Sequence, residues 1–392
     1  MPSSLDPKSD RSGHFVSQQS GSLGAYSAFI PAPLPPQPPL AFGPELQDAL
    51  ERANRELGRL DGITALLDPK VFLYMYVRKE AVLSSQIEGT QSSLSDLLEY
   101  ESGEHPGVPM ADVEEVSNYI RAMNHGLDRL EKLPMSLRLL REIHGILMHR
   151  ARGGEKTPGE FRRSQNWVGG TRPGNAVYVP PPPHEMMIAL DNLEKFLHDR
   201  PGPTPPLLKA GLGHAQFETI HPFQDGNGRV GRLLITFVLC ADGALAQPTL
   251  YLSLYLKEKK EEYYQALQRV RTHGDWEGWV LFYLRGVEAA AKQATETARR
   301  LIKLFDVDRQ RITRLGRAAS SALELHELLK QRAIVTIPGA TATLNELTRQ
   351  TVTAALERLV RLGIVREVKL HPRRRQFAYT KYLGILTAGI EG

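Results

Sequence analysis

The sequence predicts a mainly α-helical protein that ends in a smaller α+β unit of the winged helix-turn-helix type. Apolar residues recur at helical spacing from residue 44 to about residue 317. The pattern then changes to helices followed by two short strands around the Arg373-Arg374-Arg375 turn, which is the element order of a winged helix. Residues 309–392 also hold fifteen Lys and Arg against six Asp and Glu, so the excess positive charge lies in this unit.

Composition narrows the class of protein. The 392 residues are 41% hydrophobic and 24% charged, as expected of a chain that folds around a core. The single cysteine, Cys240, excludes an intrachain disulfide and a cysteine-based zinc site. No apolar run approaches the roughly 20 residues of a membrane-spanning helix, and the sequence does not open like a signal peptide. We therefore expect a cytoplasmic protein without a membrane partner.

Four regions are expected along the chain. Residues 1–44 are rich in Ser, Gly and Pro and predict an extended or disordered arm, because the prolines of residues 31–39 cannot lie in a helix. Residues 45–110 predict an N-terminal helical extension. Residues 111–308 predict the core, and residues 309–392 predict the winged-helix unit.

Proline, glycine and β-branched residues set the expected element boundaries. Asp68-Pro69 begins a helix, since proline is tolerated in the first turn. Residues 161–183 predict a short β-hairpin, because β-branched and aromatic residues flank Gly-Gly and Pro-Gly-Asn turns. Helices are expected over residues 44–60, 69–87, 92–101, 111–132, 136–151, 184–199, 204–220, 228–242, 255–272, 274–293 and 295–317. The C-terminal unit is expected to contain helices at 319–331, 341–347 and 348–362 and strands at 334–337, 364–368 and 376–379.

One segment combines the residues that a polyphosphate site needs: His221-Pro222-Phe223-Gln224-Asp225-Gly226-Asn227-Gly228-Arg229-Val230-Gly231-Arg232. Its glycines let backbone N–H groups approach a ligand, and the following helix directs its positive N-terminus at the same place. Arg229 and Arg232 can bind phosphate oxygens, and Asp225 is an oxygen ligand suited to phosphate-bound Mg²⁺. His221 can take a proton from a hydroxyl near neutral pH. The alternative is an ordinary turn with a hydrogen-bonded histidine and solvated arginines.

The segment resembles the signature of the Fic family, His-x-Phe-x-Asp/Glu-Gly-Asn-Gly-Arg-x-x-Arg, and it matches all eight fixed positions. It lacks the Gly-Lys-Ser/Thr of a Walker A loop. The resemblance implies a helical Fic core with a short β-hairpin flap. It also implies an adenylyltransferase that moves AMP from ATP, with Mg²⁺, to a Ser, Thr or Tyr hydroxyl of a protein. The Doc branch of the family has Lys where this chain has Gly228-Arg229, so the nucleotidyl-transfer version is expected.

The resemblance also implies roles for individual residues. His221 would deprotonate the target hydroxyl, pyrophosphate would leave, and Phe223 would pack the loop on the core. Asp225 would bind Mg²⁺. The anion hole would be formed by Gly226, Asn227 and Gly228. The β- and γ-phosphates would be held by Arg229 and Arg232.

Two other segments resemble parts of the family that contact ligands. Asn175-Ala176-Val177-Tyr178-Val179-Pro180 looks like the flap, whose edge docks the target as an added strand; the alternative is an ordinary surface hairpin. Tyr263-Tyr264 looks like the pair near the adenine, although a plain amphipathic aromatic pair fits nearly as well. Some relatives place an Asn seven residues beyond that pair, where this chain has Arg271, which weakens the adenine assignment.

Ser84-Ser85-Gln86-Ile87-Glu88-Gly89 resembles the inhibitory signature Ser/Thr-x-x-x-Glu-Gly/Asn of the family. Ser84 and Glu88 are four residues apart and lie one above the other on a helix face. The resemblance implies that Glu88 enters the site as a carboxylate partner of Arg232. The alternative is a solvated glutamate near a helix end.

Three functions remain open from the sequence. The leading hypothesis is an adenylyltransferase autoinhibited by Glu88. The second is removal of AMP from a protein by the same residues, and the third is a DNA-binding regulator whose core senses nucleotide. The expected small molecules are ATP and Mg²⁺. The expected partners are a protein with a hydroxyl side chain, duplex DNA at the C-terminal unit and a second copy of the chain.

Overall fold

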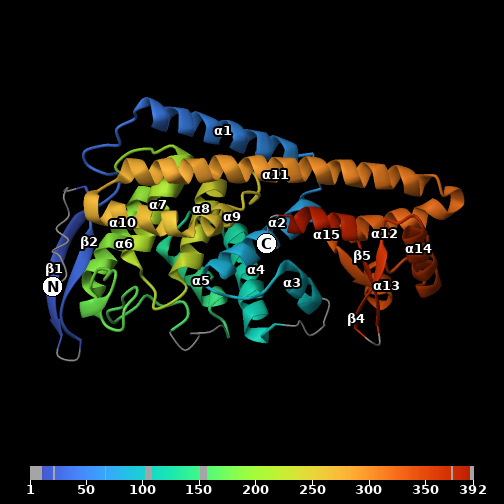
Figure 1. Cartoon of the computed structure of the whole chain (residues 1–392), viewed down its shortest axis with the longest axis horizontal. Helices are drawn as coiled ribbons and strands as arrows, with labels where there is room; N and C mark the ends of the chain where they lie inside the picture. Colours follow the sequence, from blue (N-terminus) through green and yellow to red (C-terminus); the bar gives the residue numbers. More distant parts are fainter. Residues whose placement is uncertain are drawn as a thin grey trace.

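The computed structural model describes residues 11–20, 23–66, 68–101, 108–150, 157–371 and 374–388. The chain is mainly helical, as predicted. The longest helix, α11 (Trp276–Thr313), runs along the molecule with α1 (Pro44–Thr64) beside it (Figure 1). Among the residues that the structure describes, no helix is both long and apolar enough to cross a membrane.

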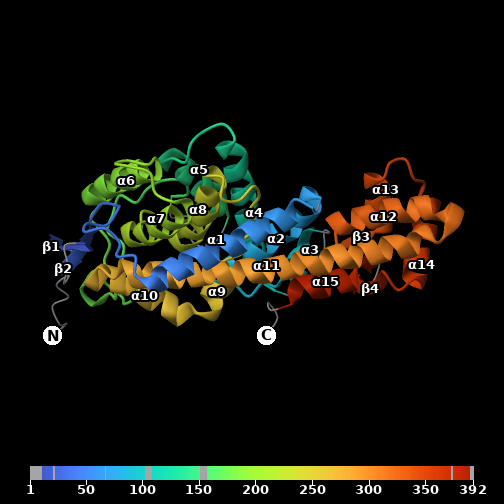
Figure 2. The same ribbon diagram turned by 90° about the horizontal axis from the view of Figure 1, so that it is seen from above.

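The helices α7 (Pro206–Ile220) and α8 (Asn227–Ala241) form the centre of the fold. All residues of α7 after its first proline are buried, because neighbouring elements cover it on every side. The surrounding helices are α4 (Met110–Leu130), α5 (Leu137–Leu147), α6 (Pro183–Leu197), α9 (Ser253–Glu258) and α10 (Lys260–His273). Seen from above, α7 and α8 lie between α6 and the long helix (Figure 2).

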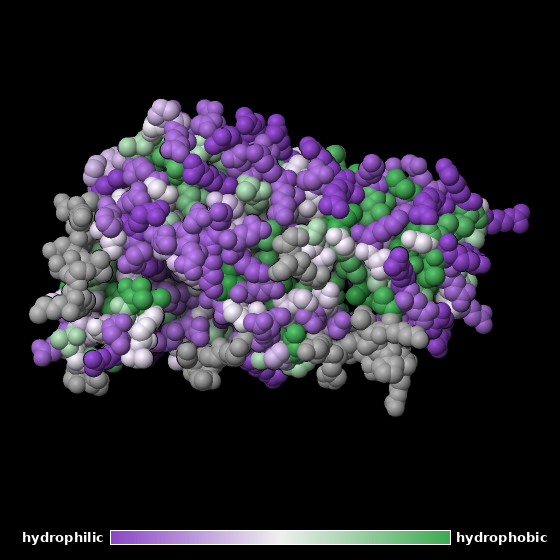
Figure 3. All heavy atoms as spheres, viewed as in Figure 1, coloured by the Kyte–Doolittle hydropathy of each residue, from purple (hydrophilic) through white to green (hydrophobic). Residues whose placement is uncertain are grey.

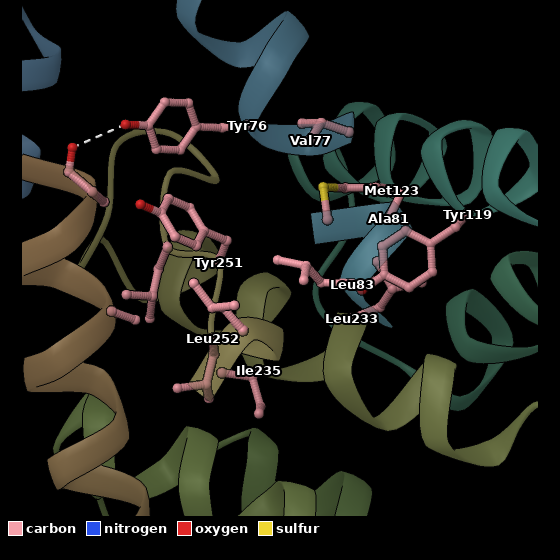
Figure 4. Close-up of a cluster of buried hydrophobic side chains, with 14 of the residues drawn as sticks. Tyr76, Val77, Ala81, Leu83, Tyr119, Met123, Leu233, Ile235, Tyr251 and Leu252 are labelled. Atoms are coloured by element: carbon pink, nitrogen blue, oxygen red, sulfur yellow. Dashed lines mark hydrogen bonds between the residues drawn. The ribbon is translucent and has the colours of Figure 1, made fainter. Parts of the chain in front are cut away.

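The helix α2 (Pro69–Ile87), followed by α3 (Leu94–Glu101), is built into this core rather than laid on its surface. Tyr76, Val77 and Ala81 lie in a buried cluster that also contains Tyr119 of α4 and Leu233 of α8 (Figure 4). The hydroxyl of Tyr76 donates to the carbonyl of Ala294 on α11 at 2.9 Å. The position of α2 is therefore fixed by three other helices.

The N-terminal region differs from the expected arm. Residues Gly13–Ser20 (β1) and Gly24–Pro31 (β2) form an antiparallel hairpin, with Phe15 opposite Phe29. The prolines that exclude a helix begin only at the end of β2, so they do not prevent strand pairing before it. A bidentate ion pair from Arg11 to Glu277 of α11, at 2.9 and 3.0 Å, fastens the base of the hairpin.

Three further boundaries differ from those predicted. The helices expected over 274–293 and 295–317 are one helix, α11, because no Gly or Pro interrupts residues 290–300. The helix expected over 255–272 is broken at Lys259 into α9 and α10. The hairpin expected over 161–183 is reduced to one bridge, between Val168 and Tyr178, and a 3-10 turn, η1 (Pro173–Asn175).

The C-terminal unit, residues 319–388, has the predicted order of helices and strands up to its last strand, and it ends in a short helix that the sequence did not predict. A second 3-10 turn, η2 (Gly316–Ala318), joins it to α11. Its elements are α12 (Ala319–Gln331), β3 (Ile334–Thr336), α13 (Ile337–Thr343), α14 (Arg349–Arg361), β4 (Arg366–His371), β5 (Arg374–Ala378) and α15 (Thr380–Thr387).

The strands of this unit form an antiparallel sheet in the order β3-β5-β4. Of the basic turn, Arg373 and the side chain of Arg374 lie outside the described residues. The boundary expected between residues 308 and 309 falls inside α11, which continues to Thr313.

On the face seen in Figure 3, hydrophilic residues predominate over the helical body, while hydrophobic residues gather over the C-terminal unit.

Candidate functional site

The signature segment forms the loop between α7 and α8. His221 ends α7 with a left-handed backbone (φ 50°, ψ 58°), and Gly226 precedes α8 with φ 75°. The side chain of Asn227 closes the loop: its Oδ1 accepts the N–H of Phe223 at 2.9 Å, and its Nδ2 donates to the Phe223 carbonyl at 2.9 Å. Because the Asn227 side chain is bonded to Phe223 in this way, we expect its anion-hole role to fall to its backbone N–H.

Phe223 anchors this loop on the core with the help of His144, a residue that sequence reasoning missed. The rings of Phe223 and His144 stack with centroids 3.8 Å apart and planes 9° apart. The Nδ1 of His144 accepts the N–H of Gly159 at 2.9 Å, so its Nε2 carries the proton and donates to the Asp225 carbonyl at 3.1 Å. Burial lowers the pKa of His144 to about 4, which preserves this neutral tautomer at pH 7.

The environment of His221 keeps its imidazole neutral. Burial, aided by the positive charges of Arg271 and Arg162, lowers the pKa of His221 to about 4. Arg162, which is 2% exposed, donates from Nε to the His221 carbonyl at 3.0 Å, and Asn166 donates to the same oxygen at 3.3 Å. The imidazole is also hydrogen-bonded to the backbone of Glu218. At pH 7 it can therefore accept a proton from a nearby hydroxyl.

Arg232 joins α8 to α2. Its Nε donates to the Ser84 hydroxyl at 2.8 Å, and its Nη2 donates to the Ser84 carbonyl at 3.0 Å and to the Glu88 carboxylate at 2.7 Å. A Cβ placed on Gly228 would collide with this carboxylate, so Glu88 lies against the first turn of α8. Arg232 and the helix N-terminus thus hold a carboxylate where the sequence predicts a phosphate.

The carboxylate of Glu88 is charged at neutral pH. Burial acts to raise the pKa of Glu88, but Arg232 and two further cations outweigh burial and lower the pKa below its usual value. One of these cations, Lys260, also donates to the carbonyl of Ile87 at 2.8 Å and so secures the last turn of α2. The ion pair with Arg232 is therefore supported at both the side chain and the helix end.

The other two charged residues of the signature have different surroundings. The Nη1 of Arg229 donates to Glu115 of α4 at 3.1 Å, and each side chain is 5% exposed. An oxygen of Asp225 accepts the N–H of Gly226 at 2.7 Å. A phosphate that binds Arg229 would therefore share its charge with Glu115, a residue that sequence reasoning missed.

The two tyrosines predicted near an adenine lie in different environments. Tyr263 is 1% exposed, and its hydroxyl is 2.8 Å from the Nε2 of His214. The Nδ1 of His214 must donate to the carbonyl of Gly231, 2.8 Å away, so its Nε2 accepts the Tyr263 proton. Tyr264 is 45% exposed. Tyr263 therefore supports α8 from the core, and of this pair only Tyr264 has a ring open to a ligand.

The predicted flap is anchored through Tyr178. The side chain of Tyr178 is buried, and its hydroxyl donates to the Thr219 carbonyl at 2.5 Å. The guanidinium of Arg271 lies 4.0 Å from the centre of the Tyr178 ring. These contacts tie the flap to the last turn of α7, directly before His221.

The remaining flap residues differ in what they can offer to a target strand. The carbonyl of Val179 accepts the N–H of Phe29 on β2 at 2.9 Å, so the N-terminal hairpin already pairs with this edge at one point. Val177 is 67% exposed, while Ala176 is half-buried. The exposed apolar surface of the flap is completed by Val168, the bridge partner of Tyr178.

Two family models match the chain. Residues 47–128 match the N-terminal region of the Fic/DOC family, and residues 134–239, which contain the whole signature, match the Fic/DOC family itself. The chain therefore contains a Fic/DOC N-terminal region followed by a Fic domain. Ser84 and Glu88 fall within the Fic N-terminal region, and both matches end before the C-terminal unit.

Curated Fic proteins align with a limited part of the chain. The protein adenylyltransferase Fic of Aedes aegypti is 36% identical over 125 residues, which are 32% of this chain and 22% of that protein. The protein of the same name from Drosophila virilis is 32% identical over 157 residues, or 39% of this chain and 28% of that protein. The alignment thus spans less than a third of the length of either relative.

Solved Fic structures share the fold. A Fic family protein from Desulfovibrio desulfuricans G20 superposes with a TM-score of 0.59 at 21% identity and covers 87% of this chain and 98% of that chain. A Fic domain-containing signalling protein from Bacteroides thetaiotaomicron VPI-5482 gives a TM-score of 0.50 at 19% identity, over 63% of this chain and 96% of that chain. These likenesses confirm a mainly helical Fic fold.

Proposed function

We propose that the chain is a protein adenylyltransferase that transfers AMP from ATP to a hydroxyl side chain of a protein. The observation that carries this proposal is the loop between α7 and α8, which joins a neutral histidine, His221, to a helix N-terminus bordered by Arg232. The first feature suits proton removal and the second suits polyphosphate binding. The name of the curated relatives supports the same reaction.

In the proposed reaction, the target hydroxyl oxygen attacks the α-phosphorus of ATP. The proton of that hydroxyl passes to the imidazole of His221, and the bond from the α-phosphorus to the oxygen that bridges to the β-phosphate breaks. Pyrophosphate leaves with the electron pair of that bond. The backbone N–H groups of Gly226 to Gly228 and the guanidinium of Arg232 stabilise the phosphate charge.

The residues present fit a magnesium ion that comes with the nucleotide. Among the described residues, no group of three or more His, Cys, Asp and Glu side chains could hold a metal ion alone. Mg²⁺ commonly takes one or two protein carboxylates and completes its shell with phosphate oxygens and water, and Asp225 in the phosphate loop would be that carboxylate. When bound, the ion neutralises charge on the leaving pyrophosphate.

Glu88 is proposed to inhibit this site. Its carboxylate is paired with Arg232 at 2.7 Å and lies against Gly228, where it opposes a terminal phosphate by both charge and volume. Withdrawal of Glu88 would remove the carboxylate from Arg232 and from the first turn of α8 together, although Ser84 would still accept hydrogen bonds from Arg232.

The proposed activity is tested with labelled ATP, a lysate as the source of target proteins, and mass spectrometry of the modified residues. The Glu88→Gly variant should attach AMP to hydroxyl side chains, and the Glu88→Gly, His221→Ala double variant should not. Label that arrives as a γ-phosphate, or equal labelling by both variants, contradicts the proposal.

The C-terminal unit is proposed to bind duplex DNA as an accessory role. On α14, Arg349 and Arg361 are exposed, and Arg366 is exposed at the start of β4. An exposed basic helix followed by a hairpin can contact phosphates of a duplex at two places.

A further inference from the structure

Two carboxyl groups lie against one face of α8. Gly228 and Gly231 are three residues apart and therefore share a face of the helix. A Cβ at Gly228 would collide with an oxygen of Glu88, and a Cβ at Gly231 would collide with Oε1 of Glu218. Glu88 directly follows α2. Glu218 comes from α7, one turn before His221, and no role described so far uses its carboxyl group.

The carboxyl group of Glu218 lacks a partner where one is expected. Its side chain is 7% exposed, and its Oε1 has no hydrogen-bond partner among the described residues. Buried acceptors in folded proteins are nearly always satisfied, so an orphan points to a missing donor. The nearby Tyr263 hydroxyl cannot supply one, because its proton goes to His214. A donor must therefore come from outside the described side chains.

The surroundings of Glu218 match the expected course of a bound nucleotide. The Glu218 carboxyl interacts electrostatically with Arg232, Glu88 and Arg271. It also interacts electrostatically with Tyr264, whose ring is partly exposed. The pKa of Glu218 is raised to about 7, mainly by burial and further by the negative charge of Glu88. The group therefore tolerates a neutral state in the inhibited protein and can accept hydrogen bonds once Glu88 withdraws.

We propose that Glu218 contacts the nucleoside of the bound nucleotide. After Glu88 leaves Gly228, the phosphates occupy the first turn of α8 and the carboxyl of Glu218 accepts hydrogen bonds from neutral nucleoside donors. Two donors of ATP have this chemistry: the ribose hydroxyls and the exocyclic amine of adenine. The inference rests on the proposed function, because it assumes that the phosphate loop binds a nucleoside triphosphate.

Glu80 provides a matched control. Its side chain is 5% exposed and its pKa is also raised to about 7, mainly by burial. Unlike Glu218, it has donors for its carboxyl oxygens: the backbone N–H and hydroxyl of Ser253 and, at 3.2 Å, the hydroxyl of Tyr119. Glu80→Gln therefore reports the general effect of neutralising a buried carboxyl in this core.

The experiment measures dissociation constants by isothermal titration calorimetry in the Glu88→Gly background. The titrants are ATP, 2′-deoxy-ATP, 3′-deoxy-ATP, inosine triphosphate and inorganic tripolyphosphate, which lacks a nucleoside. Glu218→Leu should weaken ATP binding about tenfold or more and leave tripolyphosphate binding unchanged. Glu218→Gln keeps one acceptor oxygen and nearly the same shape, so it should lose less. Glu80→Gln should not change the ratio of the two affinities.

The titrations with nucleotide analogues identify the group of ATP that donates a hydrogen bond to Glu218. The analogue that lacks the contacted group should bind more weakly than ATP to the parent and should lose no further affinity in Glu218→Leu. Unchanged ATP affinity in folded Glu218→Leu and Glu218→Gln, or equal loss for ATP and tripolyphosphate, overturns the inference while leaving the adenylyltransferase proposal intact. If the Glu88→Gly parent binds neither ATP nor tripolyphosphate, both proposals fail.

Discussion

In the proposed reaction, the imidazole of His221 accepts a proton although its pKa is low. In the free protein, burial and two arginines lower that pKa to about 4, so the acceptor form is fully populated at pH 7. A base with so low a pKa is also weak. The negative charge of bound ATP acts in the opposite direction, because an anion near a histidine favours its protonated form. Nucleotide binding should therefore strengthen this base at the moment when it is needed.

This argument predicts different pH profiles for the two kinetic constants of the Glu88→Gly variant. The kcat/KM for ATP reports the free enzyme, so it should stay level from pH 7 to about 5 and fall only toward pH 4. The kcat reports the nucleotide complex and should begin to fall at a higher pH. Labelled AMP incorporation measures both, with circular dichroism as the control for unfolding. Profiles that both halve near pH 6.5 would argue for an unperturbed, solvated histidine.

His221→Ala should abolish AMP transfer and leave ATP affinity within a few-fold of its starting value. In the proposed reaction, the base acts on the attacking hydroxyl, while the α8 N-terminus and Arg232 hold the phosphates. Calorimetry with ATP and incorporation of labelled AMP, both in the Glu88→Gly background, separate binding from transfer. A variant that loses ATP binding and transfer together would mean that His221 shapes the phosphate loop instead.

The residues that the sequence identified are those whose chemistry is concentrated in one segment. His144, Arg162 and Glu115 were missed because each acts on the signature from a distant part of the chain. His144 follows the buried Leu140 and Ile143 at helical spacing, so its position on the core face could have been predicted. Its contact with the Asp225 carbonyl could not, because that contact depends on how α5 packs against the loop.

At the scale of an element, α2 is bonded to the rest of the fold at several points along its length. Tyr76 and Glu80 bind α11, α4 and the segment at Ser253, Ser84 receives Arg232, and Glu88 covers Gly228. Only the contacts of Ser84 and Glu88 lie where a phosphate is proposed to bind, and of the two only Glu88 brings a negative charge. Removal of Glu88 alone should therefore open the site without dislodging the helix.

Glu88→Gly should raise AMP transfer about ten- to a hundredfold, because a carboxylate on Arg232 misplaces the reacting phosphate and small misplacements cost about that much in rate. Glycine near a helix end costs at most about 1 kcal/mol in stability, so the protein should remain folded. Self-modification and lysate labelling provide the readout. Equal rates for the parent and the variant, with matched ATP affinity, would sink the autoinhibition proposal.

Ser84→Ala should raise transfer less than Glu88→Gly, by about two- to tenfold. The substitution removes one acceptor from Arg232 but leaves the Ser84 carbonyl and the Glu88 carboxylate in place. The same labelling assay ranks the parent, Ser84→Ala and Glu88→Gly in increasing order. If Ser84→Ala transfers AMP faster than Glu88→Gly, the serine and not the carboxylate is the main source of inhibition.

Element boundaries followed the sequence where a local signal exists and departed from it where packing decides. Pro69 marks the start of α2 and Pro183 the start of α6, as the first-turn preference of proline requires. The break at Lys259 has no proline or glycine and was missed. The β1–β2 hairpin was also missed, because its stability comes from Phe29 against Tyr178 and from the Arg11–Glu277 pair, which join distant segments.

At the scale of the whole molecule, the C-terminal unit is in contact with α2. The Lys79 ammonium of α2 donates to the carbonyl of Ala388 at 3.3 Å, and this lysine is 2% exposed. Burial lowers its pKa to about 8. Removal of the C-terminal unit would uncover this face of α2, so a truncation cannot separate DNA binding from release of Glu88. Point substitutions on the exposed face of α14 are the cleaner test.

We expect Arg349→Ala combined with Arg361→Ala to weaken binding of duplex DNA and to leave AMP transfer unchanged. Each lost phosphate contact should reduce the slope of log K against log salt by about 0.9, so the double variant should lose nearly two units of slope. Fluorescence anisotropy with a labelled duplex between low and physiological salt measures both affinity and slope. Arg375→Ala is the control, because Glu367 already pairs with Arg375 at 2.8 and 2.9 Å and offsets its charge. Identical slopes for the parent and the double variant, or no binding even at low salt, would assign this face to a protein partner or to solvent.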